Sequence, residues 1–268
     1  MTSRTDARFD DLLALAHDLA DRSRAVILPY FRKRLDVADK GGAKGFDPVT
    51  KADQAAERAI SKLIRERAPE HGIVGEEYGA LRPDAAYQWV IDPIDGTRSF
   101  ITGVPMWGTL IGLLHEGEPV LGVMDQPFTG ERFWSGRKGA HLQTPGARPR
   151  RISTRACPRV KDAVLMTTSP DLLGEGVETE AFLRVKKEAR MTRFGGDCYA
   201  YCMLAAGFVD VVIEAGLQSY DIAALIPIVE RAGGRITTWD GRPGAEGGRI
   251  VAVGDPALHD KVLKLLNR

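Results

Sequence analysis

Two closely spaced carboxylates occur in the segment Trp89–Thr97, whose sequence is WVIDPIDGT. Asp92 and Asp95 directly follow an apolar run, where burying acidic groups is costly unless a cation neutralises them. The backbone carbonyl of Ile94 and the hydroxyl of Thr97 add two more hard oxygen atoms, the ligand type that Mg²⁺ prefers. A solvated turn is the ordinary explanation for a single Asp-Gly pair, but this combination favours a magnesium site.

The same segment offers groups that bind an anion. Pro93 restricts the turn, and Gly96 allows another group to approach the backbone closely. The amides of Gly96 and Thr97 are therefore candidates for holding a phosphate oxygen, especially if a helix begins there.

Further acidic residues occur where elements are expected to begin or end. The pair Glu76–Glu77 follows an apolar stretch, and Asp53 lies three residues after Thr50. Asp221 opens an apolar helical segment. Each has an ordinary alternative: a surface Glu pair, a solvated helix face and a helix N-cap, respectively. The five histidines are scattered, so a softer metal site is not indicated.

The composition is that of an ordinary globular chain. The 268 residues are 44% hydrophobic and 27% charged, and the net charge is +1, so a nucleic-acid or anionic-membrane partner is not indicated. We find no apolar segment of signal-peptide type or of membrane-spanning length. Three cysteines without a spaced framework fit a reducing setting, and we expect a cytoplasmic protein.

Helices and short strands are expected to position the acidic groups. The spacing of apolar residues predicts one helix over about residues 9–31 and a second from Thr50 to just before Pro69. Apolar stretches at residues 73–75 and 88–91 predict strands that run into acidic residues, and a hairpin is expected within residues 107–125.

A polar stretch rich in Pro and Arg at residues 143–151 is the expected boundary between two lobes. We therefore expect an N-terminal α+β lobe over residues 1–145, which carries most metal ligands, and a C-terminal α/β lobe over residues 146–268. In the second lobe we expect strands at 163–166, 209–214, 235–237 and 250–253, and helices at 178–190, 198–208, 221–232 and 256–266.

Taken together, these motifs resemble one known family. The segments Asp47–Asp53, Gly75–Glu77, Asp92–Thr97 and Tyr220–Asp221 match the inositol monophosphatase family in order and at similar spacing, over about residues 10–260. The resemblance implies a layered α/β/α/β/α sandwich of the inositol monophosphatase and sugar phosphatase type, two or three Mg²⁺ ions and a homodimer. It also implies that a metal-activated water hydrolyses a small phosphate monoester.

The resemblance further implies a set of metal ligands. Glu76, Asp92 and the carbonyl of Ile94 resemble the ligands of one ion. Asp92, Asp95 and Asp221 resemble the ligands of a second ion. Glu76 also resembles the contact to a third, water-rich ion.

Other roles implied by the resemblance concern the nucleophile and the phosphate. Asp53 and Thr97 resemble the pair that orients the attacking water, and the backbone of Gly96 and Thr97 would hold the phosphate. One departure is a lysine that many relatives have a few residues before the Asp-Pro-Val-Thr segment. Lys40 and Lys44 are both near, but neither has the expected spacing, so which one approaches the metal site is open.

The choice of phosphate ester depends on the C-terminal half. Inositol phosphatases have a small, uncharged segment where this chain has Phe194–Tyr201, and the Asp197 within it favours a cationic or hydrogen-donating substrate. Glu214 matches a position that contacts the substrate in the family. Arg193 is a further candidate contact, and an ordinary surface arginine is its alternative. This segment and Phe100–Ile111 resemble the histidinol-phosphate phosphatase branch. That likeness implies hydrolysis of L-histidinol phosphate in histidine biosynthesis.

Several alternatives stay open. A helix N-cap is the alternative role for Asp197. Inositol 1-phosphate, a 3′-phosphonucleotide and fructose 1,6-bisphosphate are alternative substrates. A non-catalytic relative that binds RNA or the transcription machinery is a further alternative. Its local support is one basic run without interleaved aromatic residues, which is typical of a solvated loop: Arg148, Arg150, Arg151 and Arg155.

Overall fold

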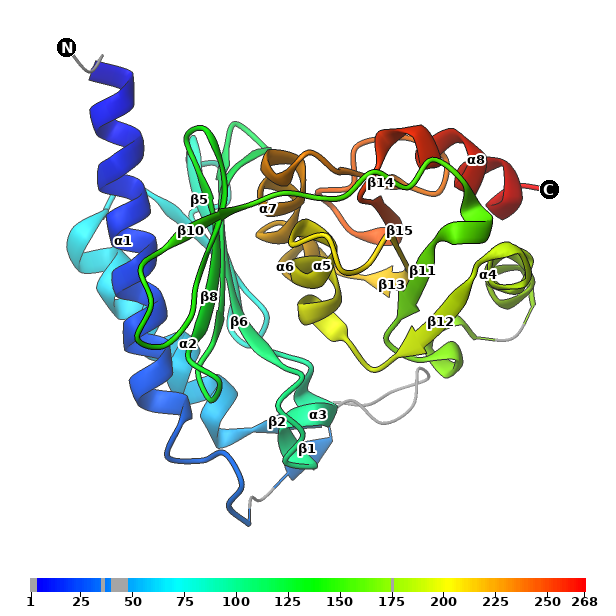
Figure 1. Cartoon of the computed structure of the whole chain (residues 1–268). Coiled ribbons are helices and arrows are strands. Elements are labelled where there is room, and N and C mark those ends of the chain that lie inside the picture. The colour runs from blue at the N-terminus through cyan, green and yellow to red at the C-terminus, as the bar shows by residue number, and fades with distance from the viewer. Residues whose placement is uncertain (1–3, 35–36, 40–47, 175) are drawn as a thin grey trace.

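Figure 1 shows the computed structural model of the chain, which describes residues 4–34, 37–39, 48–174 and 176–268. Lys40 and Lys44 lie outside the described residues. Two long helices, α1 (Arg4–Ile27) and α2 (Lys51–Arg67), confirm the two amphipathic helices predicted for the N-terminal part.

A capping box starts α2. The Thr50 side chain accepts a hydrogen bond from the backbone of Ala52 at 3.1 Å, and the Asp53 side chain accepts one from the backbone of Thr50 at 2.8 Å. These bonds satisfy amide groups that have no partner within the helix. The beginning of α2 therefore places Asp53 on its buried first turn.

An eight-stranded sheet packs against these two helices. Its strand order is β10-β9-β8-β7-β6-β5-β3-β4, in which β3 pairs with β5 in parallel and the other neighbours are antiparallel. The hairpin predicted within residues 107–125 is formed by β6 and β7. The strands are β3 (Gly72–Gly75), β4 (Gly79–Leu81), β5 (Tyr87–Asp95), β6 (Gly108–His115), β7 (Glu118–Gln126), β8 (Glu131–Gly136), β9 (Gly139–Gln143) and β10 (Arg150–Ile152).

Smaller elements flank this sheet. Strands β1 (Val37–Asp39) and β2 (Pro48–Thr50) pair antiparallel next to it. The short helix α3 (Thr97–Ile101) follows β5 directly. Two 3₁₀ turns, η1 (Val160–Asp162) and η2 (Pro170–Leu173), lie before and after the first strand of the second sheet.

The second sheet has five strands in the order β12-β11-β13-β15-β14. Strand β11 pairs in parallel with both β12 and β13, whereas β15 pairs antiparallel with β13 and β14. The strands predicted in this half are confirmed, and the edge strand β12 is one that the pattern did not predict. They are β11 (Val164–Thr167), β12 (Met191–Phe194), β13 (Val211–Leu217), β14 (Arg235–Thr238) and β15 (Gly248–Val253).

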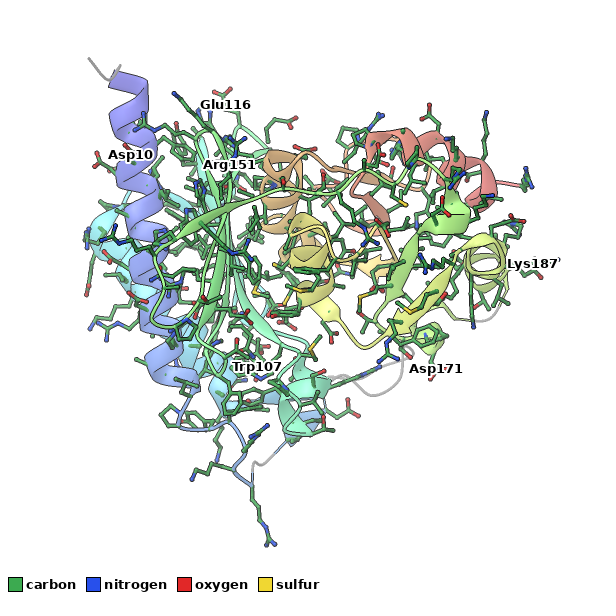
Figure 2. The ribbon with its side chains drawn as sticks, in the orientation of Figure 1. Asp10, Trp107, Glu116, Arg151, Asp171 and Lys187 are labelled. Atoms are coloured by element: carbon green, nitrogen blue, oxygen red, sulfur yellow. The ribbon has the colours of Figure 1, made fainter. Side chains whose placement is uncertain are left out.

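The helices and sheets alternate as layers (Figure 1). Helices α1 and α2 lie outside the first sheet, three helices fill the space between the sheets, and two cover the outer face of the second sheet. Charged side chains such as Asp10 and Lys187 project from the outer helices, as Figure 2 shows. The expected layered α/β/α/β/α sandwich is thereby confirmed. The inner helices are α5 (Asp197–Ala205), α6 (Ser219–Ile222) and α7 (Leu225–Ala232), and the outer ones are α4 (Val177–Glu188) and α8 (Pro256–Leu266).

Glycine allows the inner helices to approach the first sheet closely. A Cβ atom at Gly122 on β7 would lie 1.8 Å from the carbonyl oxygen of Ala224, the residue before α7. One at Gly112 on β6 would lie 3.0 Å from the amide nitrogen of the same residue. The helix predicted over residues 221–232 is in fact split into α6 and α7 at this contact.

The segment predicted as a lobe boundary contributes to the first sheet. Residues 150–152 form β10, which pairs with β9. The second sheet then starts at Val164. The two lobes were expected at residues 1–145 and 146–268, and we propose that the boundary between them lies after β10, so that each lobe contains one sheet. Within the described part of the chain, no helix is long and apolar enough to cross a membrane.

Candidate active site

Three carboxylates converge where the first sheet meets the inner helices. Oxygen atoms of Asp92, Asp95 and Asp221 all lie within 4.8 Å of one another. Two of them come from the end of β5, and the third comes from α6. The structure thus brings together three of the acids that the sequence predicted as metal ligands.

A bulge at the end of β5 gives the first two acids their directions. The pairing of β5 with β6 shifts register between Asp92 and Asp95, which is the place of Pro93 and Ile94. A bulge bends a strand locally and changes where its side chains point. The hydroxyl of Thr109 on β6 donates to the carbonyl oxygen of Pro93 at 2.7 Å, which fixes the bulged backbone.

Each acid in the cluster accepts a hydrogen bond from a backbone amide. Asp92 Oδ1 accepts from the N–H of Ile94 at 2.9 Å. Asp95 Oδ2 accepts from the N–H of Cys198 at 2.6 Å, and Asp221 Oδ2 from the N–H of Gln218 at 2.6 Å. Because a carboxylate has about four acceptor positions, these bonds orient the acids and leave capacity for a further ligand.

The electrostatics of the cluster favour a bound cation. Burial raises the pKa of Asp92 well above its ordinary value, and the nearby carboxylates of Glu76, Asp95 and Asp221 raise it further. Burial and then the carboxylates of Asp197 and Asp221 raise the pKa of Asp95 in the same way. Crowded, buried acids of this kind are costly without a positive charge. The donor set of carboxylate oxygens fits Mg²⁺.

Glu76 adjoins this cluster from the neighbouring strand. Its backbone N–H donates to the carbonyl oxygen of Ile91 at 3.2 Å, directly after β3 ends. Its side chain lies close enough to Asp92 to raise the pKa of that carboxyl. The parallel pairing of β3 with β5 therefore brings Glu76 beside the first acid of the motif.

Asp53 and Thr97 approach the site from different elements. Thr50 donates to Asp53 Oδ2 through both its N–H, at 2.8 Å, and its hydroxyl, at 2.6 Å. Burial raises the pKa of Asp53 to about 6. The Thr97 hydroxyl donates to the carbonyl oxygen of Ile94 at 3.1 Å. A direct Asp53–Thr97 contact is not among the hydrogen bonds of the described residues.

Gly96 forms the turn between the acidic cluster and α3. Its φ is +84°, a left-handed conformation in which side chains are strained. A Cβ atom there would lie 2.8 Å from the carbonyl oxygen of Met106 and 3.2 Å from the Asp197 carboxyl carbon. Both the conformation and the space therefore require glycine. Thr97, the other proposed phosphate contact, begins α3.

A cavity of about 420 Å³ adjoins the acidic cluster. Asp95, Asp221 and the Gly96–Ser99 segment line one side of it, and Asp197, Glu214 and Tyr201 line another. The cavity therefore lies between the acidic cluster and two of the residues that the sequence singled out for substrate choice.

Asp197 occupies an unusual backbone position. It is the first residue of α5, yet its φ is +42°, and the N-cap is Gly196, which makes no side-chain capping bond. The Asp197 carboxylate accepts from Ser99 at 3.4 Å, and burial raises its pKa to about 6. The N-cap alternative for Asp197 is therefore wrong, because its side chain faces Ser99 instead of the helix amides.

Glu214 is buried and already holds protein donors. It accepts from the Thr167 hydroxyl at 3.1 Å, and from the Thr168 N–H at 2.7 Å and hydroxyl at 2.9 Å. Burial raises its pKa to about 7. These three bonds fix the end of β11 at the cavity and leave Glu214 about one acceptor position for another group.

Comparisons with known proteins agree with this geometry. The sequence profile of the inositol monophosphatase family matches residues 9–268. The chain belongs to the inositol monophosphatase family. A solved inositol monophosphatase from Zymomonas mobilis is 41% identical, has a TM-score of 0.86, and is matched over 97% of this chain and 99% of its own.

Among proteins of this family, two further relatives are informative. The bifunctional phosphatase IMPL2, chloroplastic, of Arabidopsis thaliana is 45% identical over 98% of this chain and 77% of its own length. A histidinol-phosphatase of Mycobacterium tuberculosis is 37% identical over 96% of this chain and 98% of its own. The chain is thus a phosphatase of a family that is metal-dependent, generally with Mg²⁺.

Not every residue proposed for the site lines the cavity. Arg193 lies on the exposed part of β12, and the lining of the cavity contains Arg98 and Ser99 instead. These two directly follow the Asp92–Thr97 motif, so extending that motif would have found them. Tyr201 and Thr168 were also missed, since no sequence signal marks a cavity wall.

Proposed function

We propose that this chain is a Mg²⁺-dependent phosphomonoesterase that prefers L-histidinol phosphate, and that it serves histidine biosynthesis. The observation that supports the substrate is the half-buried carboxylate of Asp197 on the wall of the cavity. Desolvation raises its pKa although Arg98 lies close enough to lower it, so a further positive charge would stabilise the carboxylate and a leaving alcohol with a protonated amine is favoured. Histidinol has such an amine and an imidazole.

The acids of the cluster would hold the metal ions. Glu76, Asp92 and the carbonyl of Ile94 would bind one ion, and Asp92 would be shared with a second ion bound by Asp95 and Asp221. When bound, Mg²⁺ neutralises the phosphate dianion and acidifies a coordinated water. Two or three ions remain our proposal, with Glu76 as the contact to the third.

The remaining roles belong to the chain's own groups. Both Thr50 donors bind Asp53 Oδ2, so Oδ1 is the atom that would accept a proton from the attacking water. Thr97 would help orient that water. The amides of Gly96 and Thr97 would hold the phosphate, since glycine keeps that backbone uncovered. Glu214 would support the leaving group with its last acceptor position.

Relatives support this substrate and also one competitor. A Mycobacterium tuberculosis relative is named a histidinol-phosphatase, whereas the Zymomonas mobilis structure is an inositol monophosphatase of 41% identity. Inositol 1-phosphate is therefore the second candidate. The IMPL2 relative is named bifunctional. This chain, too, is therefore proposed to accept inositol 1-phosphate as a second, weaker substrate.

A substrate panel tests the proposal. We expect kcat/KM with Mg²⁺ to be at least about tenfold higher for histidinol phosphate than for inositol 1-phosphate, a 3′-phosphonucleotide or fructose 1,6-bisphosphate, because a charge-assisted hydrogen bond contributes about 1.5–3 kcal/mol. A tenfold preference for inositol 1-phosphate would overturn the Asp197 argument. Loss of activity in EDTA with recovery on adding Mg²⁺ tests the metal.

The assembly and location are also proposals. The family resemblance supports a homodimer, which light scattering on the purified protein would test. Three unpaired, buried cysteines support a reducing, cytoplasmic setting. Fractionation of the source cells would test the location.

A further inference from the structure

An acidic side chain outside the metal cluster contacts the turn that carries Glu76. Glu57 lies on α2 and is 1% exposed. Its Oε2 accepts from the backbone N–H of Glu77 at 2.8 Å, and its Oε1 accepts from the backbone N–H of Tyr78 at 3.0 Å. A carboxylate that accepts two amides in this way is a strong, directional contact.

No space for a side chain remains between the Glu57 carboxylate and the backbone of Gly75. A Cβ atom at Gly75 would lie 1.9 Å from Glu57 Oε1 and 2.4 Å from its carboxyl carbon. Gly75 is the last residue of β3 and directly precedes Glu76. Glycine at this position therefore lets the helix carboxylate reach the amides beyond Glu76.

The backbone of Glu76 is consequently held on both sides. On its N-terminal side, its own N–H binds the carbonyl oxygen of Ile91 at 3.2 Å. On its C-terminal side, the next two amides bind Glu57. The first contact is to the residue before Asp92, whose carboxyl lies close to the Glu76 side chain. Arg58, the neighbour of Glu57, also contacts the Tyr78 hydroxyl.

We propose that Glu57 is a positioning residue for the cation site: it fixes the turn so that the Glu76 carboxylate stays beside Asp92. This inference rests on the proposed function, because it assigns Glu76 to metal binding. Glu57 itself binds the backbone amides of Glu77 and Tyr78. Its contribution should therefore appear in the affinity for Mg²⁺ more than in the rate at saturating Mg²⁺.

Two variants separate hydrogen bonding from charge. Glu57→Gln keeps the length of the side chain, but its amide group cannot accept from the second N–H. Glu57→Asp keeps the charge but is shorter by one carbon–carbon bond, about 1.5 Å. Glu66→Gln is the matched control, because Glu66 is an exposed acid on the same helix, paired with Lys62.

The test measures how tightly the full chain binds Mg²⁺ without substrate. Binding is measured as the rise in Tm when Mg²⁺ is added, and kcat at saturating Mg²⁺ is measured separately. We expect both Glu57 variants to need at least about tenfold more Mg²⁺ for half of the Tm rise, since supporting contacts to metal ligands are worth roughly 10–100-fold. Their kcat should stay within about threefold, and the Glu66 variant should match the parent.

Two results would overturn the inference. One is Mg²⁺ affinity within twofold of the parent in both Glu57 variants. The other is parental affinity in Glu57→Asp alone, which would assign the effect to charge. Amide hydrogen exchange in EDTA provides a test without metal: the amides of Glu77 and Tyr78 should exchange at least tenfold faster in both variants. If the parent binds no Mg²⁺ while exchange changes as expected, the proposed function fails and the positioning contact stands.

Discussion

The Asp95 carboxylate accepts a 2.6 Å hydrogen bond from the backbone N–H of Cys198, a residue 103 positions later in the chain. This bond joins the end of β5 in the first sheet to the first turn of α5. It therefore links Asp197, the neighbour of Cys198, to the acidic cluster. The acids proposed to bind the ions and the residue proposed to read the leaving group are thus connected through one hydrogen bond, so substitutions at Asp95 and at Asp197 are expected to be coupled.

Replacing Asp92 should abolish catalysis. Asp92→Asn keeps an acceptor for the Ile94 N–H but removes the charge proposed to bind two ions. We expect Mg²⁺-dependent phosphate release to fall by more than about 100-fold, because even residues that only support a metal ligand are worth roughly 10–100-fold. Asp221→Asn should behave in the same way. Activity near that of the parent in either variant would refute the metal assignment.

The same variant should not be less stable without metal. In EDTA, Asp92→Asn removes a buried charge that other carboxylates repel. Its free energy of unfolding in urea should therefore equal or exceed that of the parent. A clear loss of stability would mean that the acid is required by the fold and would make the activity result ambiguous.

Asp197→Asn should relax substrate selectivity. Asn tolerates positive φ about as well as Asp, so the strained backbone at the start of α5 is matched in the two proteins. We expect kcat/KM for histidinol phosphate to fall roughly tenfold or more relative to inositol 1-phosphate, since a charge-assisted bond contributes about 1.5–3 kcal/mol. An unchanged ratio would show that Asp197 does not read the substrate.

The sequence predicted those parts of the site whose chemistry is contiguous. Asp92, Asp95 and Gly96 are neighbours, and their residue types alone indicate metal and anion binding. Glu57 could not be predicted in this way, because its partners are backbone amides that any residue supplies. Arg193 was proposed as a further polar contact, but it lies at an exposed position of the edge strand β12, and alternate residues of a strand point to opposite sides.

The fold was predictable where a regular spacing of apolar residues extended over a long segment. Both N-terminal helices and the β6–β7 hairpin were expected near their observed bounds. Strand β10 was not expected, because three residues in a Pro- and Arg-rich stretch carry too little alternation to indicate a strand. Its place in the sheet depends on pairing with β9, which is a tertiary contact.

Glu214 predicts how stability depends on pH. Burial raises its pKa to about 7 from the ordinary 4.5, so between these values the folded state keeps a proton that the unfolded state releases. This contribution to stability is complete below pH 4.5 and is lost as the pH rises through about 7. The loss amounts to up to about 3 kcal/mol. In EDTA, urea unfolding at several pH values should show this slope, and Glu214→Gln should reduce it without removing it, because the raised pKa values of Asp53 and Asp197 add slopes of the same sign.

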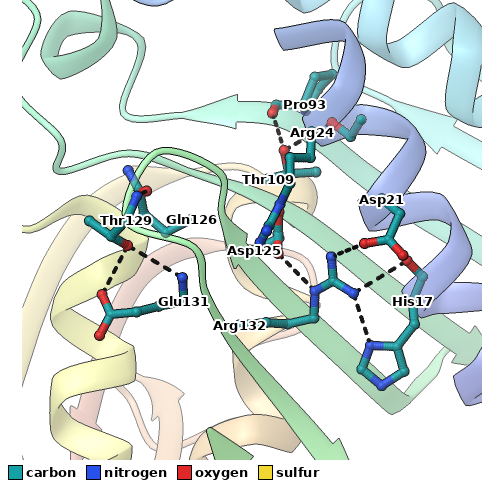
Figure 3. A network of polar contacts seen from close by, with 11 residues as sticks. His17, Asp21, Arg24, Pro93, Thr109, Asp125, Gln126, Thr129, Glu131 and Arg132 are labelled. Atoms are coloured by element: carbon teal, nitrogen blue, oxygen red, sulfur yellow. Dashed lines mark hydrogen bonds and ion pairs between the residues drawn. The ribbon is translucent and has the colours of Figure 1, made fainter. Parts of the chain in front are cut away.

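The buried acid Asp125 predicts a large stability effect away from the site. Figure 3 shows Asp125 between Arg24 of α1 and Arg132 of β8. Asp125 Oδ1 lies 2.6 Å from Arg24 Nη2 and 2.7 Å from Arg132 Nε, and its side chain is fully buried. Removing one partner of a buried pair leaves charges uncompensated. Asp125→Asn should therefore lower the free energy of unfolding by about 3–5 kcal/mol.

A surface pair on the same helix provides the control for Asp125→Asn. Asp10 of α1 binds Arg137, and the Asp10 side chain is 53% exposed. Exposed ion pairs contribute about 0–1 kcal/mol, so Asp10→Asn should change the free energy of unfolding by less than about 1 kcal/mol. Similar losses in the two variants, measured by urea unfolding at one pH, would mean that the buried network holds α1 on the sheet no better than a surface pair does.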